Sequence, residues 1–95
     1  MLHTVINSPF RCDFNALLRM LANGDDVLLM QDGVLAALEG SQALELLLLA
    51  PISLYALQDD VIARGLSAQI SSSVAAVSYT EFVALTVKQT QQMTW

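Results

Sequence analysis

Cys12 is the only cysteine of the chain and its most obvious candidate for chemistry. It lies in the stretch SPFRCDFNALL, beside Arg11 and near the start of a helical pattern. A thiol becomes nucleophilic when neighbouring cations or a helix N-terminus lower its pKa, so Cys12 is a candidate working thiol. A single cysteine excludes an internal disulfide and a metal site built from several thiolates.

The start of this helix can be placed in two ways. With the cap at Ser8, Cys12 lies in the opening turns and points away from the apolar stripe, about 200° around the helix axis. With the cap at Asp13, Cys12 lies just outside the helix and can pack on Leu17. The apolar stripe, which we expect to anchor the helix in the core, consists of Phe10, Phe14, Leu17, Leu18 and Leu21.

Carboxylates gather where two strands are predicted to end. Asp32 follows one of these strands, and Asp59 and Asp60 follow the other. A phosphoacceptor or metal site would need such carboxylates and a nearby lysine, but the one lysine, Lys88, is distant in sequence. The simpler interpretation is a turn residue at Asp32 and negative charge at a helix N-terminus at Asp59 and Asp60. A small module that senses a ligand at these acids is the alternative.

His3 is the only histidine, and it lies inside the first predicted strand. No second residue stands at the spacing of a metal ligand. A glycine-rich phosphate loop and a serine nucleophile elbow are both missing from the sequence. We therefore expect His3 to be a packed, hydrogen-bonded side chain, and we expect neither a metal nor a cofactor.

The elements that position these residues alternate along the chain. Apolar runs predict strands at 1–6, 26–31, 52–57 and 74–77, with a fifth edge strand at 92–95. Helical spacing predicts helices at 10–21, 34–49, 59–64 and 78–88. The helix at 34–49 has a weak point at Gly40-Ser41, and Pro51 prevents its continuation. Ser78 and Glu81 have the spacing of a capping box.

This alternation predicts an α/β fold. Strands separated by helices require right-handed crossovers and a mostly parallel sheet with helices on both faces. We predict one compact doubly wound domain over residues 1–95, with four to five strands. Function in such domains usually lies at the carboxyl ends of the strands, which here are residues 7–10, 31–34, 57–60 and 78–80.

Composition narrows the classes of partner. The formal net charge is −5, and the four strong cations are scattered, so direct binding of nucleic acid is not expected. No signal peptide and no membrane span are evident, which predicts a soluble, cytoplasmic protein. Of the residues, 55% are hydrophobic and 14% are charged, more apolar surface than a small monomer hides comfortably. We therefore expect a partner subunit to cover part of it.

The leucine-rich helix in SQALELLLLAP suggests where such a partner could bind. Leu44, Leu47 and Leu48 share one face and suit the core. Leu46 lies about 200° from Leu44 and should face outward, with Leu49 beside it. We predict that Leu46 and Leu49 belong to a partner interface.

Six segments in order carry a resemblance to a known family: LHTVINSPF, LLMQDGVLAALEG, APISLYAL, VIARGL, YTEFVALTVK and QMTW. Together they resemble the DsrE/DsrF/DsrH-like sulfur-relay proteins from end to end, most closely the DsrH-like branch. The resemblance implies a small parallel α/β domain that joins TusC-like and TusD-like chains in a heterotrimer, which pairs into a hexamer. Such a complex passes persulfide sulfur from a TusA-like to a TusE-like carrier. The sulfur becomes the 2-thio group of the wobble uridine in tRNA.

The resemblance also bears on the candidate thiol. The carrier cysteine of catalytic relatives lies eight residues before a glycine that matches Gly65, which places Leu57 at that position. Some DsrH-like relatives carry a cysteine in the first helix, where this chain has Leu17. Cys12 matches neither position, so the resemblance implies a non-catalytic structural subunit. The alternatives are a DsrH-like subunit of a sulfur-oxidation relay, or a thiol carrier that uses Cys12.

Overall fold

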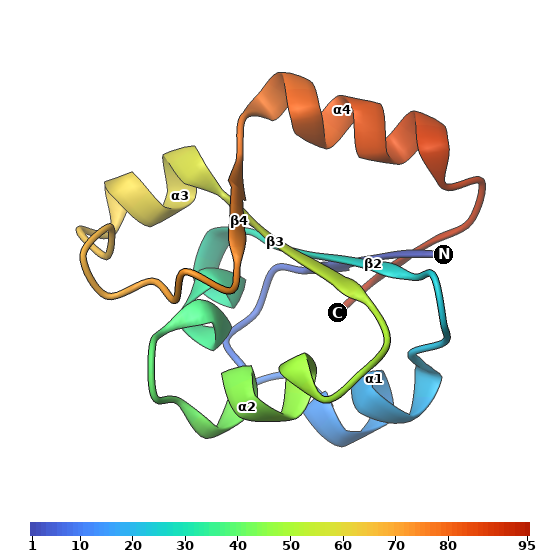
Figure 1. The fold of residues 1–95 in the computed structure, drawn as a ribbon, viewed down its shortest axis with the longest axis horizontal. Coiled ribbons are helices and arrows are strands. Elements are labelled where there is room, and N and C mark those ends of the chain that lie inside the picture. The colour runs from blue at the N-terminus through green and yellow to red at the C-terminus, as the bar shows by residue number, and fades with distance from the viewer.

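The computed structural model describes residues 1–95 and contains a five-stranded parallel sheet (Figure 1). The strands are β1 (Leu2–Val5), β2 (Asp26–Leu29), β3 (Ser53–Leu57), β4 (Ala75–Val77) and β5 (Gln92–Thr94). Their order in the sheet is β4-β3-β2-β1-β5, and every pair is parallel. The predicted α/β class and the fifth edge strand are both confirmed.

The connections place helices on both faces of the sheet. The helical segments are α1 (Phe14–Met20), the 3-10 segment η1 (Gln31–Ala37), α2 (Gln42–Leu48), α3 (Gln58–Ala63) and α4 (Tyr79–Lys88). The chain steps from β1 through β4 in one direction and then returns through α4 to the opposite edge at β5. Because right-handed crossovers in opposite directions lie on opposite faces, α4 lies across the sheet from α1 and α2 (Figure 1).

The core is divided by the sheet into two unequal parts. The larger cluster has 13 buried residues, among them Leu17 of α1, Leu44 and Leu47 of α2, and Val61 of α3. The smaller has four: Leu2, Leu28, Val77 and Leu85. Strands β1 and β2 are buried along their whole length, as expected of parallel strands that are covered on both faces.

The predicted helix at 34–49 is wrong, because it is two segments. The chain turns at Gln31, whose φ is 52°, and enters η1 before the expected start. After Ala37, Leu38 pairs with Ile70 in an antiparallel bridge, and the Glu39 N–H donates to the Gln69 carbonyl at 2.8 Å. These tertiary hydrogen bonds occupy backbone groups that a continuous helix would need.

The second of these two segments, α2, begins at Gly40-Ser41, the weak point that the sequence indicates. Gly40 has a φ of +81°, and the Ser41 hydroxyl caps α2 by accepting from the Leu44 N–H at 3.2 Å. A capping box at Ser78 and Glu81 opens α4, as predicted.

Helix α1 begins at the later of the two predicted starts. The Asp13 carboxylate accepts from the Ala16 N–H at 3.0 Å, so Asp13 is the N-cap. Upstream, the N–H groups of Arg11 and Cys12 donate to the Ser8 carbonyl and form a turn. Cys12 is therefore outside the helix. None of the helices combines the length and the apolar character that crossing a membrane requires.

Candidate functional site

The carboxyl ends of β2 and β3 bring together the acids that the sequence singles out. Asp32 and Asp60 both lie beside the Arg64 guanidinium, which is 3.0 Å from Asp32 Oδ1 and 3.8 Å from Asp60 Oδ1. Asp60 Oδ2 also accepts from the Gln31 N–H at 2.6 Å. Asp59 is exposed and has no such partner. The sequence pattern did not identify Arg64 as the counterion that connects η1 to α3.

Through these contacts the cluster clamps η1 to α3. Arg64 lies within salt-bridge distance of both carboxylates and neutralises part of their negative charge. No three His, Cys, Asp or Glu side chains gather as a metal site would require. The clamp lies beside Leu57, which is buried at the end of β3 and directly precedes α3.

Gly33 lets η1 approach β1 closely at the same edge. A Cβ atom added there would overlap the carbonyl oxygen of Val5. The Met30 N–H donates to that same carbonyl at 3.0 Å. The backbone of η1 thus lies directly against the backbone of β1 at the carboxyl edge of the sheet, and only glycine fits at position 33.

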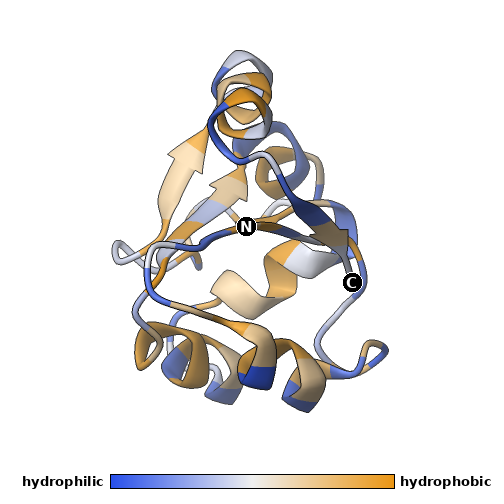
Figure 2. Cartoon of the chain, turned by 90° about the vertical axis from the view of Figure 1, so that its right-hand side faces the viewer, coloured by the Kyte–Doolittle hydropathy of each residue, from blue (hydrophilic) through white to orange (hydrophobic).

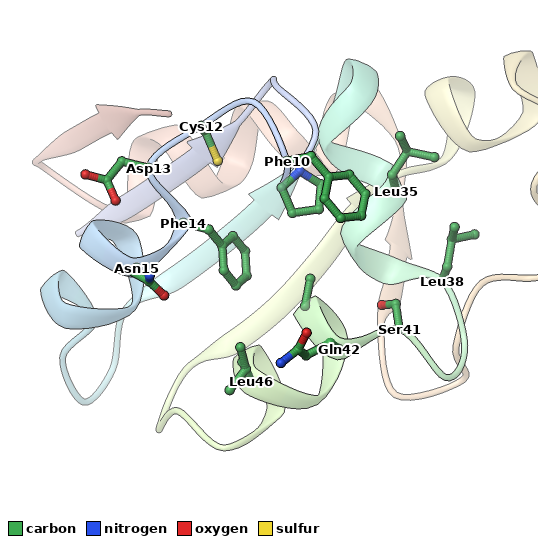
Figure 3. A pocket seen from close by; sticks show the side chains of 12 residues that line it. Phe10, Cys12, Asp13, Phe14, Asn15, Leu35, Leu38, Ser41, Gln42 and Leu46 are labelled. Carbon is green, nitrogen blue, oxygen red and sulfur yellow. The ribbon is translucent and has the colours of Figure 1, made fainter.

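A hollow of about 490 Å³ lies between the start of α1 and the η1–α2 segment (Figure 3). Seven of its twelve lining residues are hydrophobic, and they include Phe10, Phe14 and Leu46. Cys12 borders this hollow together with Asp13. The sequence did not predict this hollow.

The environment of Cys12 favours the neutral thiol. Partial burial raises the pKa of Cys12 above its ordinary value of 9.0, and this outweighs the lowering of the pKa by a backbone hydrogen bond. The charge of the neighbouring Asp13 carboxylate adds a smaller rise. Cys12 lies outside the helix, so its direction is not set by the helical rotation of about 200° that the earlier start at Ser8 would give. What matters instead is that its surroundings are apolar and acidic.

The division of the apolar side chains of this region into buried and exposed ones differs from the prediction. Leu44 and Leu47 are buried as expected, but Leu48 is 46% exposed, because α2 ends there. Leu49 is 83% exposed, and Leu46 is half-buried at the hollow. Phe10, expected in the core, is 91% exposed because the chain at residues 8–12 is a turn rather than the first part of α1.

A second exposed apolar surface lies across the sheet on α4. Tyr79, Val83 and Val87 occur at every fourth position, and all three are exposed. This spacing places them along one side of the helix. In Figure 2 hydrophobic colour extends over α4 at one end of the view and over α1 and α2 at the other.

His3 is a fully buried, hydrogen-bonded side chain, as the sequence predicts for a packed histidine. Its Nε2 atom lies 3.1 Å from Asp25 Oδ2, and its Nδ1 atom lies 3.1 Å from the indole Nε1 of Trp95. The Asp25 carboxylate also binds the Met1 amino group at 2.9 Å. Sequence reasoning missed Asp25 and Trp95, although two acids at the start of an apolar run were a usable signal.

The pKa of Asp25 is lowered. Burial acts to raise it, but hydrogen bonds from the Met1 amino group, the Ala22 N–H and His3, together with the charge of that amino group, outweigh burial. This polar network lies at the amino edge of the sheet, opposite the edge where ligands usually bind in such folds. It holds strands together and offers no open site.

Comparison with known proteins identifies a family. The model of the DsrH-like proteins matches residues 7–92. Curated relatives described as Protein TusB align over the whole of both chains: the protein of Erwinia tasmaniensis is 62% identical, and those of Yersinia pestis and Escherichia fergusonii are each 56% identical.

Solved structures show the same fold. The crystal structure of the ychN protein from E. coli superimposes with a TM-score of 0.77 at 18% identity, covering 99% of this chain and 97% of that one. The solution NMR structure of Tm0979 from Thermotoga maritima gives a TM-score of 0.67 at 29% identity, covering 96% and 97%.

Proposed function

The chain belongs to the DsrH-like family, and on this premise we propose that it is a non-catalytic subunit of a cytoplasmic sulfur-relay complex. In this complex it joins TusC-like and TusD-like subunits in a dimer of heterotrimers. The complex passes persulfide sulfur from a TusA-like to a TusE-like carrier for 2-thiolation of the wobble uridine of tRNA. Full-length identity of 62% to a protein described as TusB is the observation that carries the proposal.

The exposed apolar surfaces support the role of a subunit. Leu49 and Phe10 on one side, and Val87 on the other, leave hydrophobic area in contact with water. Exposed apolar side chains that share one face, as Tyr79, Val83 and Val87 do on α4, are typical of sites of protein interaction. We propose that Leu46 and Leu49 contact a partner subunit.

The residues near Leu57 support the absence of catalysis. Leu57 has no group that could bind sulfur, and the only thiol, Cys12, has a raised pKa. A persulfide carrier needs a thiolate to attack the donor sulfur. We therefore propose that another subunit holds the reactive sulfur and that this chain completes the assembly.

Co-expression tests the proposal. The tagged chain should copurify with its TusC-like and TusD-like partners at the mass of a hexamer, measured by light scattering. A strain lacking the chain should lose 2-thiouridine from its tRNA. A chain that stays monomeric in the presence of both partners, or a deletion strain with fully thiolated tRNA, would contradict it.

A further inference from the structure

Strand β5 is an edge strand of the sheet, and one hydrogen bond beside it depends on His3. All three residues of β5 are exposed, and β5 pairs only with β1. Beyond the ladder, the Trp95 backbone is held by its N–H, which donates to the Thr4 carbonyl at 2.8 Å, and by its carbonyl, which accepts from the Ile6 N–H at 3.0 Å. The Trp95 indole N–H donates to His3 Nδ1 at 3.1 Å. His3 Nδ1 is thus the one hydrogen-bond acceptor of the Trp95 side chain, which also packs against the core and stacks on the His3 ring.

The two partners of His3 determine where its proton lies. An indole N–H can only donate, so Nδ1 of His3 must be the acceptor and carries no hydrogen. The hydrogen is then on Nε2, which donates to Asp25 Oδ2 at 3.1 Å. The ring is thus held as one neutral tautomer between a donor and a carboxylate.

We propose that His3 is a proton-sensitive latch for β5. A proton added to Nδ1 converts the acceptor into a donor, so two N–H groups face each other and the hydrogen bond to Trp95 is lost. The bond to Asp25 remains and becomes an ion pair. Protonation therefore releases the Trp95 side chain and loosens β5 while leaving β1 paired with β2.

The charged groups around His3 allow this response. Asp25 contacts the ring directly, and its own partner is the Met1 amino group. Lys88 of α4 is paired with Asp26. Because the pKa of Asp25 is lowered, this carboxylate stays ionised between pH 8 and pH 5.5.

Hydrogen exchange of the full chain tests the latch, alone or copurified with partners. We expect the protection of amides 91–95, corrected for the intrinsic exchange rate, to fall roughly threefold to tenfold from pH 8 to pH 5.5, the equivalent of one hydrogen bond. Protection of β2 should not change. Trp95 is the only tryptophan, so in the isolated chain its fluorescence should shift to longer wavelength over the same range.

Two substitutions of His3 distinguish the roles of its two ring nitrogens. His3→Asn places an oxygen near the Nδ1 position and does not titrate, so β5 should stay protected at both pH values. His3→Gln retains a donor toward Asp25 but lacks the acceptor, so β5 should be loose at both. If either variant fails to fold, Trp95→Phe removes the donor instead and should make β5 protection low and independent of pH.

Three results would overturn the latch. The first is wild-type protection of amides 91–95 that does not change between pH 8 and 5.5. The second is a loss of protection between pH 8 and pH 5.5 that is as large in His3→Asn or Trp95→Phe as in the wild type. The third is a loss that extends equally to β2, which would indicate global unfolding.

Discussion

Lys88 Nζ lies 3.0 Å from Asp26 Oδ2, and this carboxylate is 1% exposed while the lysine side chain is largely in solvent. The Gln89 amide donates to the same oxygen at 2.9 Å, and the other oxygen, Oδ1, has no partner. Asp26 opens β2, and Lys88 closes α4. The pair therefore anchors the long return of the chain from β4 to β5 at the centre of the sheet.

This pair predicts a loss of stability at alkaline pH. The hydrogen bond and charge of Asp26 raise the pKa of Lys88 above its ordinary value of 10.5. A raised pKa means that the folded state holds the proton more tightly, so the stabilisation is complete below pH 10.5 and is lost as the pH rises above it. Urea midpoints should therefore fall more steeply above this pH for the wild type than for Lys88→Met. Arg19→Met, at an exposed cation, is the control and should keep the wild-type slope.

Asp25 predicts the opposite response, at acid pH. Its pKa is lowered from 3.8, so its contribution is complete above that value and is lost as the pH falls below it. Asp25→Asn should be less stable than the wild type at pH 7, and the difference should shrink toward pH 2.5. Asp59→Asn, at an exposed acid, should show no such difference in thermal unfolding. A constant gap between Asp25→Asn and the wild type would contradict the assignment.

Gly33 should tolerate no side chain. Gly33→Ala forces a Cβ into the Val5 carbonyl, so β1 and η1 must separate. We expect destabilisation of about 1–3 kcal/mol or more in urea unfolding. Gly40→Asn is the control, because the space at Gly40 is open and asparagine accepts positive φ. An equal effect of both substitutions would show that chain flexibility, rather than overlap, is the constraint.

Cys12 should be dispensable. Its pKa is raised, so the thiol is largely neutral at pH 7 and should react with iodoacetamide more slowly than a free cysteine. Cys12→Ser should change stability by less than about 1 kcal/mol and should leave tRNA thiolation at the wild-type level. A mass increase of one sulfur atom at Cys12 after exposure to a persulfide donor would contradict this prediction.

Leu47 and Leu49 should separate folding from assembly. Leu47→Ala empties a fully buried site and should cost about 2–5 kcal/mol. Leu49→Ala changes an exposed site and should alter stability by less than about 0.5 kcal/mol. If Leu49 contacts a partner, Leu49→Glu should reduce copurification of the partner subunits, whereas Glu45→Gln on the same helix should not. Wild-type copurification by Leu49→Glu would remove Leu49 from the interface.

Short-range patterns in the sequence predicted most of the fold. Pro51 and the apolar runs marked the strand boundaries, and Ser78 with Glu81 marked the start of α4. The start of α1 was left open between Ser8 and Asp13, because both residues can cap a helix, and hydrogen bonds in the turn at residues 8–12 decided for Asp13. The helical spacing within α2 correctly predicted that Leu44 and Leu47 are buried.

What the sequence by itself determined is the alternation of five strands with helices, since periodicity and capping involve residues only a few positions apart. Tertiary structure alone decided the break between η1 and α2, the exposure of Phe10 and the contacts of His3. The partners of His3 lie 22 and 92 residues away in the chain. No local pattern encodes such pairs, because they exist only once the parallel sheet has brought β1, β2 and β5 side by side.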